Sequence, residues 1–345
     1  MYSIKKLLST QTSLLTLLII SGCNDDGQSS SSTEAAPETS SKITAENAKP
    51  ITAAAFASVD IVKGLPIQGG SLGGGSGNDE SSEFNYSEFI VNQLSIMQQQ
   101  GQYMGRSSTR ASEITAKKAL DCSLHITGDI ADSSNLSVGD TATFAFDNCT
   151  YDMNLLVDGV IGVNLTQVSG DLVGVPPYEL GMDVALTDFT VDIDGVTFTS
   201  NGDISMLINE DSSSGKTAIM SGTSINVTEA LTSDIIMLNL SNYLVEASYN
   251  NSGDYSVSLQ GTTTLEIPFI SGGASFTTIT PFTGNNDNGS GDPTAGEMHL
   301  TDGESQAWVI AQADGVNIQI DIDINGDEVV ELTLMTTWSE LQDIF

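Results

Sequence analysis

The sequence predicts a mainly β fold: a large antiparallel sheet, curved or closed, with one or two short helices on its N-terminal side. From about residue 119, short runs alternate apolar and polar residues, as in Val196–Phe198 and Ile204–Ile208, which is the period of a strand with one buried face. The runs are too close together to leave room for helices between them, so neighbouring strands are expected to be antiparallel. Turn-forming pairs separate the runs: Gly128-Asp129, Gly139-Asp140, Asp158-Gly159, Gly170-Asp171, Asp194-Gly195, Asn201-Gly202, Gly253-Asp254, Asp314-Gly315 and Asn325-Gly326.

The composition describes a folded but strongly acidic chain. Of its 345 residues 39% are hydrophobic, which is too many for wholesale disorder, and the formal net charge is −35. This charge argues against nucleic-acid binding and against electrostatic docking on anionic lipid. No Lys or Arg follows Lys216, whereas 18 acidic residues do. Their carboxylates are expected to be solvated, spaced apart or bound to metal cations.

Residues 1–22 have the pattern of a secretion signal. Lys5 and Lys6 precede a short apolar stretch that ends at Ile20, too short to span a bilayer as a permanent helix. Ser21-Gly22-Cys23 resembles the lipobox of bacterial lipoproteins. The resemblance implies cleavage before Cys23 and attachment of fatty acyl chains, such as palmitate, to this cysteine; the alternative is an ordinary signal peptide.

The mature chain is expected to have three regions. Residues 23–43 comprise the lipidated cysteine and a Ser-rich, flexible tether. Residues 44–118 form a helical and Gly/Ser-rich region. It contains one helix over 44–63, with Pro50 in its first turn and Gly64 as C-cap, and a second over about 87–104. Residues 119–345 form the antiparallel β domain.

Two cysteines remain after the lipobox, Cys122 and Cys149. An even pair in an exported protein favours a disulfide between them. The alternative is a reactive thiol or metal-binding pair, for which the sequence offers few further ligands.

The C-terminal segment 317–334 predicts a hairpin, because four isoleucines alternate with polar residues before Asn325-Gly326. Register follows the buried face, so an odd loop centred on Gly326 is preferred to a two-residue turn. This register buries Val330, Leu332 and Leu334, and sets Asp321 opposite Glu331 on the outer face, with Asp323 beside them. The expected cross-strand pairs are Ile322 with Val330, Ile320 with Leu332 and Ile318 with Leu334.

This hairpin contains the candidate metal site. Acidic side chains directly opposite each other are destabilising, and a hard cation would relieve the repulsion. The oxygen donors are Asp321, Asp323, Asn325, Asp327 and Glu331. Asp321-x-Asp323-x-Asn325-Gly326-Asp327 resembles the first half of a calcium loop of the EF-hand or dockerin type, although the flanking strands exclude an EF-hand proper. Two interpretations stay open: a weak Ca²⁺ site, or a solvated acidic hairpin.

The sequence contains no convincing catalytic set. The only histidines are His125 and His299, and nothing near either in sequence suggests a catalytic base with a second residue to orient it. The segment Gly69–Gly73 matches the nucleophile-elbow pattern, but it lies in a Gly-Ser tract without a preceding strand. We therefore expect a protein that is not an enzyme and has no certain cofactor.

The chain is similar to a loose group of uncharacterised proteobacterial lipoproteins. The similarity covers the lipobox, Ile43–Ala48, the segment from Gly139 to Cys149, and the tail from Asp292 to Leu341. Together with Asn24 after the lipobox, it implies an outer-membrane lipoprotein, and it implies no activity. The first hypothesis is a lipid-anchored protein that binds or supports an unknown envelope partner. The alternatives are a carrier that holds a hydrophobic ligand in the curved sheet, and an envelope hydrolase.

Overall fold

The computed structural model describes the body of the chain from Lys42 to Ile344, with gaps. The predicted signal peptide, Cys23, Gly64, Cys122 and most of segment 87–104 lie outside the residues that it describes. The described residues are 42–63, 89–90, 93–94, 114–115, 123–130, 136–152, 155–171, 175–193, 195–230, 235–267, 270–285, 291–342 and 344.

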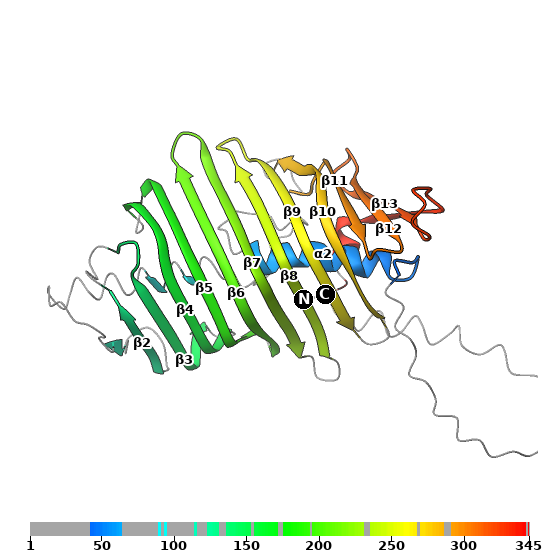
Figure 1. The fold of residues 1–345 in the computed structure, drawn as a ribbon. Helices are drawn as coiled ribbons and strands as arrows, with labels where there is room; N and C mark the ends of the chain where they lie inside the picture. Colours follow the sequence, from blue (N-terminus) through cyan, green and yellow to red (C-terminus); the bar gives the residue numbers. More distant parts are fainter. Residues whose placement is uncertain are drawn as a thin grey trace, which may run out of the picture.

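A 14-stranded antiparallel sheet forms this body, and each strand pairs with the next in sequence order. Strands β1 and β14 are its two edges, so the sheet is open rather than closed (Figure 1). The predicted mainly β, antiparallel class is therefore confirmed. The strands are β1 Ile114–Thr115, β2 Ser123–Asp129, β3 Thr141–Asp152, β4 Leu155–Asp171, β5 Val175–Ile193, β6 Val196–Asp211, β7 Gly215–Ala230, β8 Ile235–Tyr249, β9 Asp254–Ile267, β10 Ile270–Asn285, β11 Ala295–Thr301, β12 Gln306–Ala311, β13 Asn317–Asp323 and β14 Leu332–Thr337.

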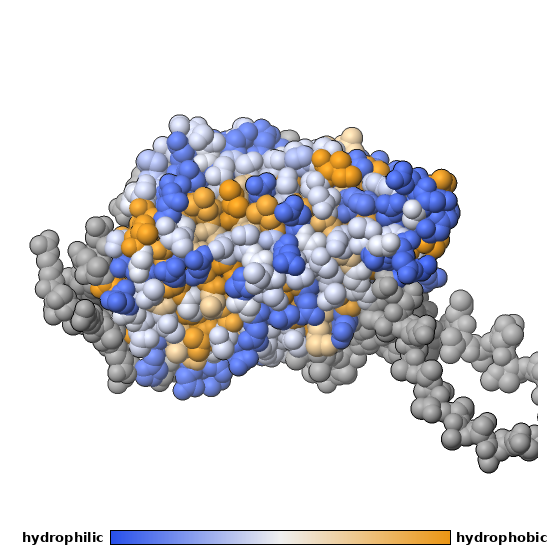
Figure 2. Space-filling view, in the orientation of Figure 1, coloured by the Kyte–Doolittle hydropathy of each residue, from blue (hydrophilic) through white to orange (hydrophobic). Residues whose placement is uncertain are grey.

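The two faces of the sheet differ in chemistry, as the alternation along the strands requires. We call the face covered by helices the inner face. It carries buried apolar side chains such as Phe144, Ile161, Met182 and Val257. The opposite, outer face carries mainly Ser, Thr, Asn and acidic residues with apolar patches between them (Figure 2).

The central strands are longer than the sequence suggested, because two of the predicted turns are β-bulges. β4 has 17 residues and β5 has 19. Asp158-Gly159 lies inside β4 and Asn201-Gly202 inside β6, each at a shift in strand pairing. The expectation of hairpin turns at these two pairs was therefore wrong.

These bulges belong to a line of irregularities that crosses the sheet. Pairing shifts also occur in β3, β5 and β8, where Asn148, Asp188 and Asn242 have positive φ. Side chains connect neighbouring irregularities: Asp188 N–H donates to Asn201 Oδ1 at 2.7 Å, and the Tyr243 hydroxyl donates to the Asp203 carbonyl at 2.7 Å. Bulges bend strands and increase their twist, so this line accounts for the curvature visible in Figure 1.

Helix α2 (Ala48–Lys63) lies on the inner face behind the central strands (Figure 1). It contacts β8, β9, β10 and β13. The helix begins later than the predicted residue 44, because Thr44 and Asn47 form the preceding turn: Thr44 N–H donates to Asn47 Oδ1 at 2.7 Å, and Ala48 N–H to the Thr44 carbonyl at 2.9 Å. Pro50 lies in the first turn, as predicted, where its missing N–H has no intrahelical partner to lose.

Aromatic packing fixes α2 and the short C-terminal helix α4 (Trp338–Gln342) to the sheet. The Phe56 ring lies 5.1 Å from both Phe282 of β10 and Trp338 of α4, in edge-to-face geometry. Residues 89–90 and 93–94 are helical, within the predicted second helix. Phe89 packs near Phe146 and Phe189, with ring centroids 5.5 and 5.9 Å away.

Candidate functional site

The candidate metal site lies in the β13–β14 hairpin, and its register differs from the prediction by two residues. Ile320 pairs with Leu334, and Ile322 with Leu332. The loop therefore has an odd number of residues, as predicted, but its centre lies one residue later than Gly326. Asp321 faces Thr333 instead of Glu331, and Val330, expected to be buried, is exposed.

The cause of the shift is the side chain of Asp323, which we expected on the outer face and which is fully buried. Its carboxylate accepts hydrogen bonds from the backbone N–H groups of residues 325 to 328 at 2.6 to 3.3 Å. Gln306 Nε2 of β12 donates a further bond at 3.0 Å. A loop wrapped around one carboxylate in this way is longer than a turn set by backbone pairing alone.

The charge of Asp323 is stabilised by these contacts. Burial acts to raise the pKa of this carboxyl, but the hydrogen bonds from Gln306, Glu328 N–H and Gly326 N–H outweigh it and lower the pKa below the ordinary 3.8. Asp323 is therefore ionised at neutral pH and serves as the acceptor around which the loop is built.

Three carboxylates meet in the loop. Asp323, Asp327 and Glu331 each offer an oxygen, and these oxygens lie within 4.8 Å of one another. Glu331 also accepts bonds from Ile324 N–H at 2.7 Å and Asn325 Nδ2 at 2.8 Å, which draws the start of the return strand toward the tip.

Asp321, the first residue of the predicted ligand set, is not part of this group. Its carboxylate accepts bonds from Thr333 Oγ1 at 2.6 Å and Gln319 Nε2 at 2.8 Å. The remaining donors have the chemistry of a hard-cation site, since Ca²⁺ takes carboxylate and amide oxygens. They begin at Asp323 rather than Asp321.

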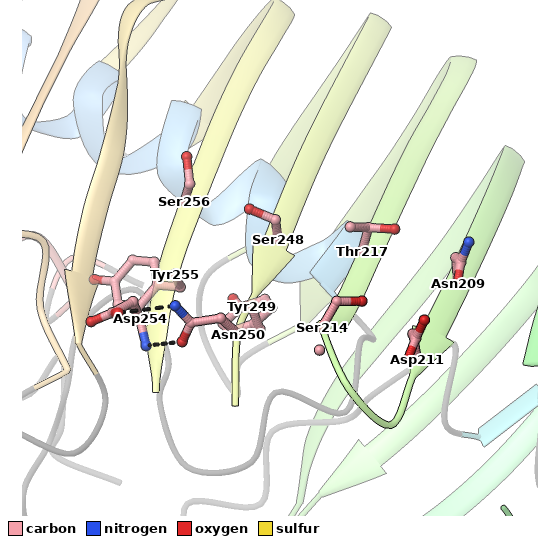
Figure 3. A pocket seen from close by; sticks show the side chains of 11 residues that line it. Asn209, Asp211, Ser214, Thr217, Ser248, Tyr249, Asn250, Asp254, Tyr255 and Ser256 are labelled. Carbon is pink, nitrogen blue, oxygen red and sulfur yellow. Dashed lines mark hydrogen bonds between the residues drawn. The ribbon is translucent and has the colours of Figure 1, made fainter. Parts of the chain in front are cut away.

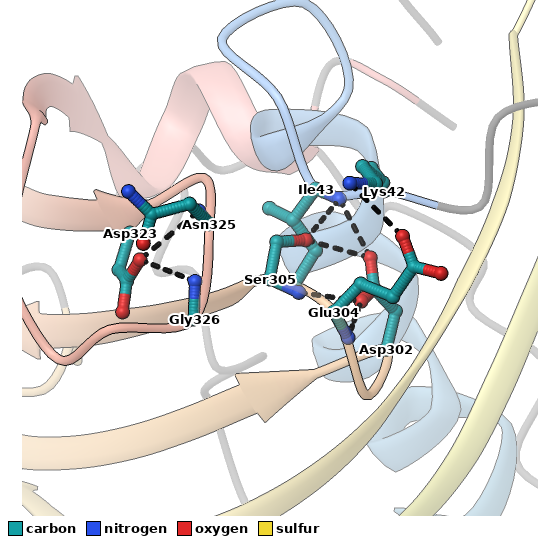
Figure 4. Close-up of polar contacts among 8 residues, drawn as sticks. All are labelled: Lys42, Ile43, Asp302, Glu304, Ser305, Asp323, Asn325 and Gly326. Carbon is teal, nitrogen blue, oxygen red and sulfur yellow. Dashed lines mark hydrogen bonds and ion pairs between the residues drawn. The ribbon is translucent and has the colours of Figure 1, made fainter.

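A second loop supports the candidate site from the neighbouring β11–β12 hairpin (Figure 4). Asp302 and Ser305 accept two bonds from Ile43 N–H, at 2.8 and 2.7 Å, and Lys42 pairs with Glu304 at 2.9 Å. Ile43 is fully buried. Residues 42 and 43, predicted to end the flexible tether, thus lie against the fold beside the candidate metal loop.

No family model, no curated protein and no solved structure matches this chain.

The other predicted site residues are placed only in part. Cys149 is buried and disulfide-bonded; its pairing with Cys122 stays a prediction, as does lipidation of Cys23. His299 is a strand residue of β11, as expected, and its Nε2 lies 2.9 Å from Gln306 Oε1. Within the described residues, no helix is long and apolar enough to cross a membrane.

Sequence reasoning missed Gln306 and the Asp302–Ser305 loop. Gln306 connects His299 with Asp323 across three strands. The Asp302-Gly303-Glu304-Ser305 segment has the composition of an Asx turn, which could have marked it as an anchoring point.

Proposed function

We propose that this protein is a lipid-anchored lipoprotein of the bacterial outer membrane with a non-enzymatic binding role, in which the outer face of the sheet meets a partner in the cell envelope. The observation that carries the proposal is the difference between the two faces. Helix α2 covers the inner face at β8 to β10, and the apolar side chains of the other central strands on that face are buried, whereas the outer face presents short polar side chains over many strands.

The outer face is suited to binding because its side chains are short and held by one another. Thr190 and Thr199 hydroxyls lie 3.2 Å apart, and those of Thr262 and Ser275 lie 3.0 Å apart. Short side chains lose little rotamer entropy when a partner covers them, and a pre-arranged surface lowers the free energy required for ordering.

The end of the predicted tether lies against the β11–β12 loop. Lys42 pairs with Glu304, and Ile43 N–H donates to Asp302 and Ser305. A flexible chain of this length spans on the order of 25 Å. The tether would keep the body near the membrane and leave the sheet face accessible.

Packing under α2 favours this role over that of a hydrophobic carrier. Phe56, Phe282 and Trp338 fill the space between α2, β10 and α4, and each is at most 6% exposed. In this part of the inner face, side chains of the protein itself occupy the place that an acyl chain would need.

We further propose that Ca²⁺ stabilises the β13–β14 loop weakly. Asp323, Asp327 and Glu331 would provide carboxylate oxygens, with Asn325 beside them. A bound cation would offset the mutual repulsion of three charges in a region without any Lys or Arg in sequence.

The anchor is tested by labelling cells with a palmitate analogue and fractionating their membranes. The wild-type chain should take up label and sediment with outer membranes, whereas Cys23→Ser should do neither. A Cys23→Ser chain that remains in the membrane fraction contradicts the anchor.

The binding role is tested by thiol accessibility. Ile219 lies on the outer face and is 40% exposed, and Val316 lies in the β12–β13 turn and is 51% exposed. A permeant maleimide should label Ile219→Cys more slowly in intact cells than in purified protein, because a partner covers it. Val316→Cys provides the control and should react equally in both. Equal labelling of Ile219→Cys in both preparations contradicts coverage of the outer face.

The calcium site is tested by calorimetric titration of the full chain after treatment with a chelator. Asp327→Asn and Glu331→Gln should each weaken the binding of Ca²⁺, while Asp314→Asn should not. Asp314 is the matched control because it also caps a hairpin turn, through bonds to Val316 and Asn317. Identical heats for all variants rule out a site in this loop.

A further inference from the structure

A polar hollow of about 440 Å³ lies at the ends of β6 to β9, where these strands meet their hairpin tips (Figure 3). Its lining combines hydroxyl, amide and carboxylate groups from four neighbouring strands. It is remote in sequence from the β13–β14 loop.

The floor of the hollow is a row of hydrogen-bonding side chains. Asn209 pairs with Thr217, Thr217 with Ser248, and Ser248 with Ser256. Directly paired residues on adjacent strands lie on one face at a spacing of about 5 Å, and Figure 3 shows these four side chains in a line across the sheet. Each can both donate and accept hydrogen bonds.

The rim of the hollow is held in place by bonds between hairpin tips. Asn251 Nδ2 donates to the Ser212 carbonyl at 3.1 Å, joining the β8–β9 tip to the β6–β7 tip. Asn285 Nδ2 of β10 donates to Asp254 Oδ1 at 2.6 Å and to the Ser252 carbonyl at 3.0 Å. A rim fixed before binding lowers the free energy that a ligand must supply for ordering.

Two acidic side chains at the rim define the charge that a ligand can carry. Bonds from Ser213 lower the pKa of Asp211, and bonds from Asn250, Asn285 and Ser252 lower that of Asp254, so both are ionised at neutral pH. Ionised carboxylates accept charge-assisted bonds from hydroxyl groups. They repel phosphates, sulfates and uronic acids.

Besides these polar groups the lining includes apolar surface, and its two aromatic residues are Tyr249 and Tyr255. The carboxylates disfavour anionic ligands, and the row of uncharged side chains favours a ligand with many hydroxyl groups that can both donate and accept hydrogen bonds. We infer that this hollow binds a short stretch of neutral oligosaccharide, with the row from Asn209 to Ser256 contacting its hydroxyls and Asp211 and Asp254 accepting from them. The inference names a ligand class for the binding role proposed above and rests on it.

The test is calorimetric titration of the full, lipidated chain in detergent with four neutral probes: maltopentaose, cellopentaose, mannopentaose and chitopentaose. At least one should bind. Thr217→Val and Asp254→Asn should each weaken that binding about tenfold, since each removes or weakens one hydrogen bond worth about 1.4 kcal/mol. The control Thr187→Val removes an exposed hydroxyl from the outer face of β5, away from the hollow, and should bind as the wild type does.

The inference is overturned if no neutral probe binds, if Thr187→Val weakens binding as much as Thr217→Val and Asp254→Asn do, or if an acidic pentagalacturonate binds equally tightly. Binding of Ca²⁺ at Asp211 and Asp254 without any sugar binding also overturns it. Thermal melts of each variant show whether it is folded. The labelling of Ile219→Cys and the fractionation of Cys23→Ser do not depend on these titrations. If no sugar binds, those two experiments still test the coverage of the outer face and the lipid anchor.

Discussion

Asp323 shows how one side chain can determine the shape of a loop. Its carboxylate accepts hydrogen bonds from four backbone N–H groups and from the side-chain amide of Gln306. Replacing it with Asn places an NH₂ group, which donates hydrogen bonds, against groups that also donate. We expect Asp323→Asn to lower the stability of the protein at neutral pH, as measured by urea unfolding.

The effect of Asp323→Asn should depend on pH in a defined direction. The folded-state pKa of Asp323 lies below its ordinary value of 3.8, so its stabilising contribution is complete above about pH 4 and is lost as the pH falls through the folded pKa. The difference in unfolding free energy between wild type and variant should therefore shrink from pH 5 to pH 3. Asp321→Asn, in the same strand, is the control. A difference that stays constant over this range would show that the charge of Asp323 has no part in the effect.

Gly159 is the position where the line of bulges demands glycine most clearly. Its φ is 94°, and a Cβ there would collide with the carbonyl oxygen of Asp188 on β5. We expect Gly159→Ala to destabilise the fold by about 1–3 kcal/mol, as the midpoint of urea unfolding would show. Gly162→Ala in the same strand meets nothing closer than 3.8 Å and should be neutral or slightly stabilising. Equal stabilities for the two variants would contradict the role of the bulge.

Helix α2 depends on the aromatic cluster at its centre. Phe56 is 6% exposed and contacts rings of both β10 and α4, so Phe56→Ala removes packing between three elements. The expected loss is about 3–5 kcal/mol. Phe56→Leu keeps most of the volume and should lose less than about 1.5 kcal/mol. Chemical denaturation of both variants measures the difference, and a loss below 1 kcal/mol for Phe56→Ala would mean that α2 is only loosely seated.

The elements differ in how far the sequence alone could predict them. Alternation identified the strands and the buried face of β13, because side-chain direction follows directly from the backbone. An Asp-Gly pair in the sequence does not distinguish a turn from a bulge: Asp194-Gly195 lies between β5 and β6, whereas Asp158-Gly159 lies inside β4. Gly195 and Gly159 both have positive φ, and only the pairing of the neighbouring strand distinguishes the turn from the bulge.

The candidate metal loop illustrates a second limit. The isoleucines predicted the parity of the β13–β14 pairing, because a shift by one residue would have exposed the buried face. They could not predict a shift by two, which keeps that face buried. Capping by Asp323 settled the register, and a side chain that binds the backbone of its own loop leaves no periodic signal.

At the scale of the whole molecule, the excess of negative charge dominates. The described residues hold three Lys–carboxylate ion pairs: Lys42 with Glu304, Lys49 with Glu340, and Lys216 with Glu210. The first two are exposed, and such pairs contribute about 0–1 kcal/mol each. Self-repulsion among the remaining carboxylates therefore outweighs attraction between opposite charges.

This balance predicts the sign of the response to salt. Raising NaCl from 10 mM to 150 mM shortens the Debye length from about 30 to 8 Å, which screens repulsion between distant carboxylates more than it weakens contacts at 3 Å. The melting temperature, measured by calorimetry with a chelator present to remove divalent ions, should rise over this range. Lys49→Gln removes one exposed ion pair and should leave the rise unchanged, because a single pair contributes little. A melting temperature that falls with salt would mean that attractive pairs, in segments beyond those described, hold the acidic body together.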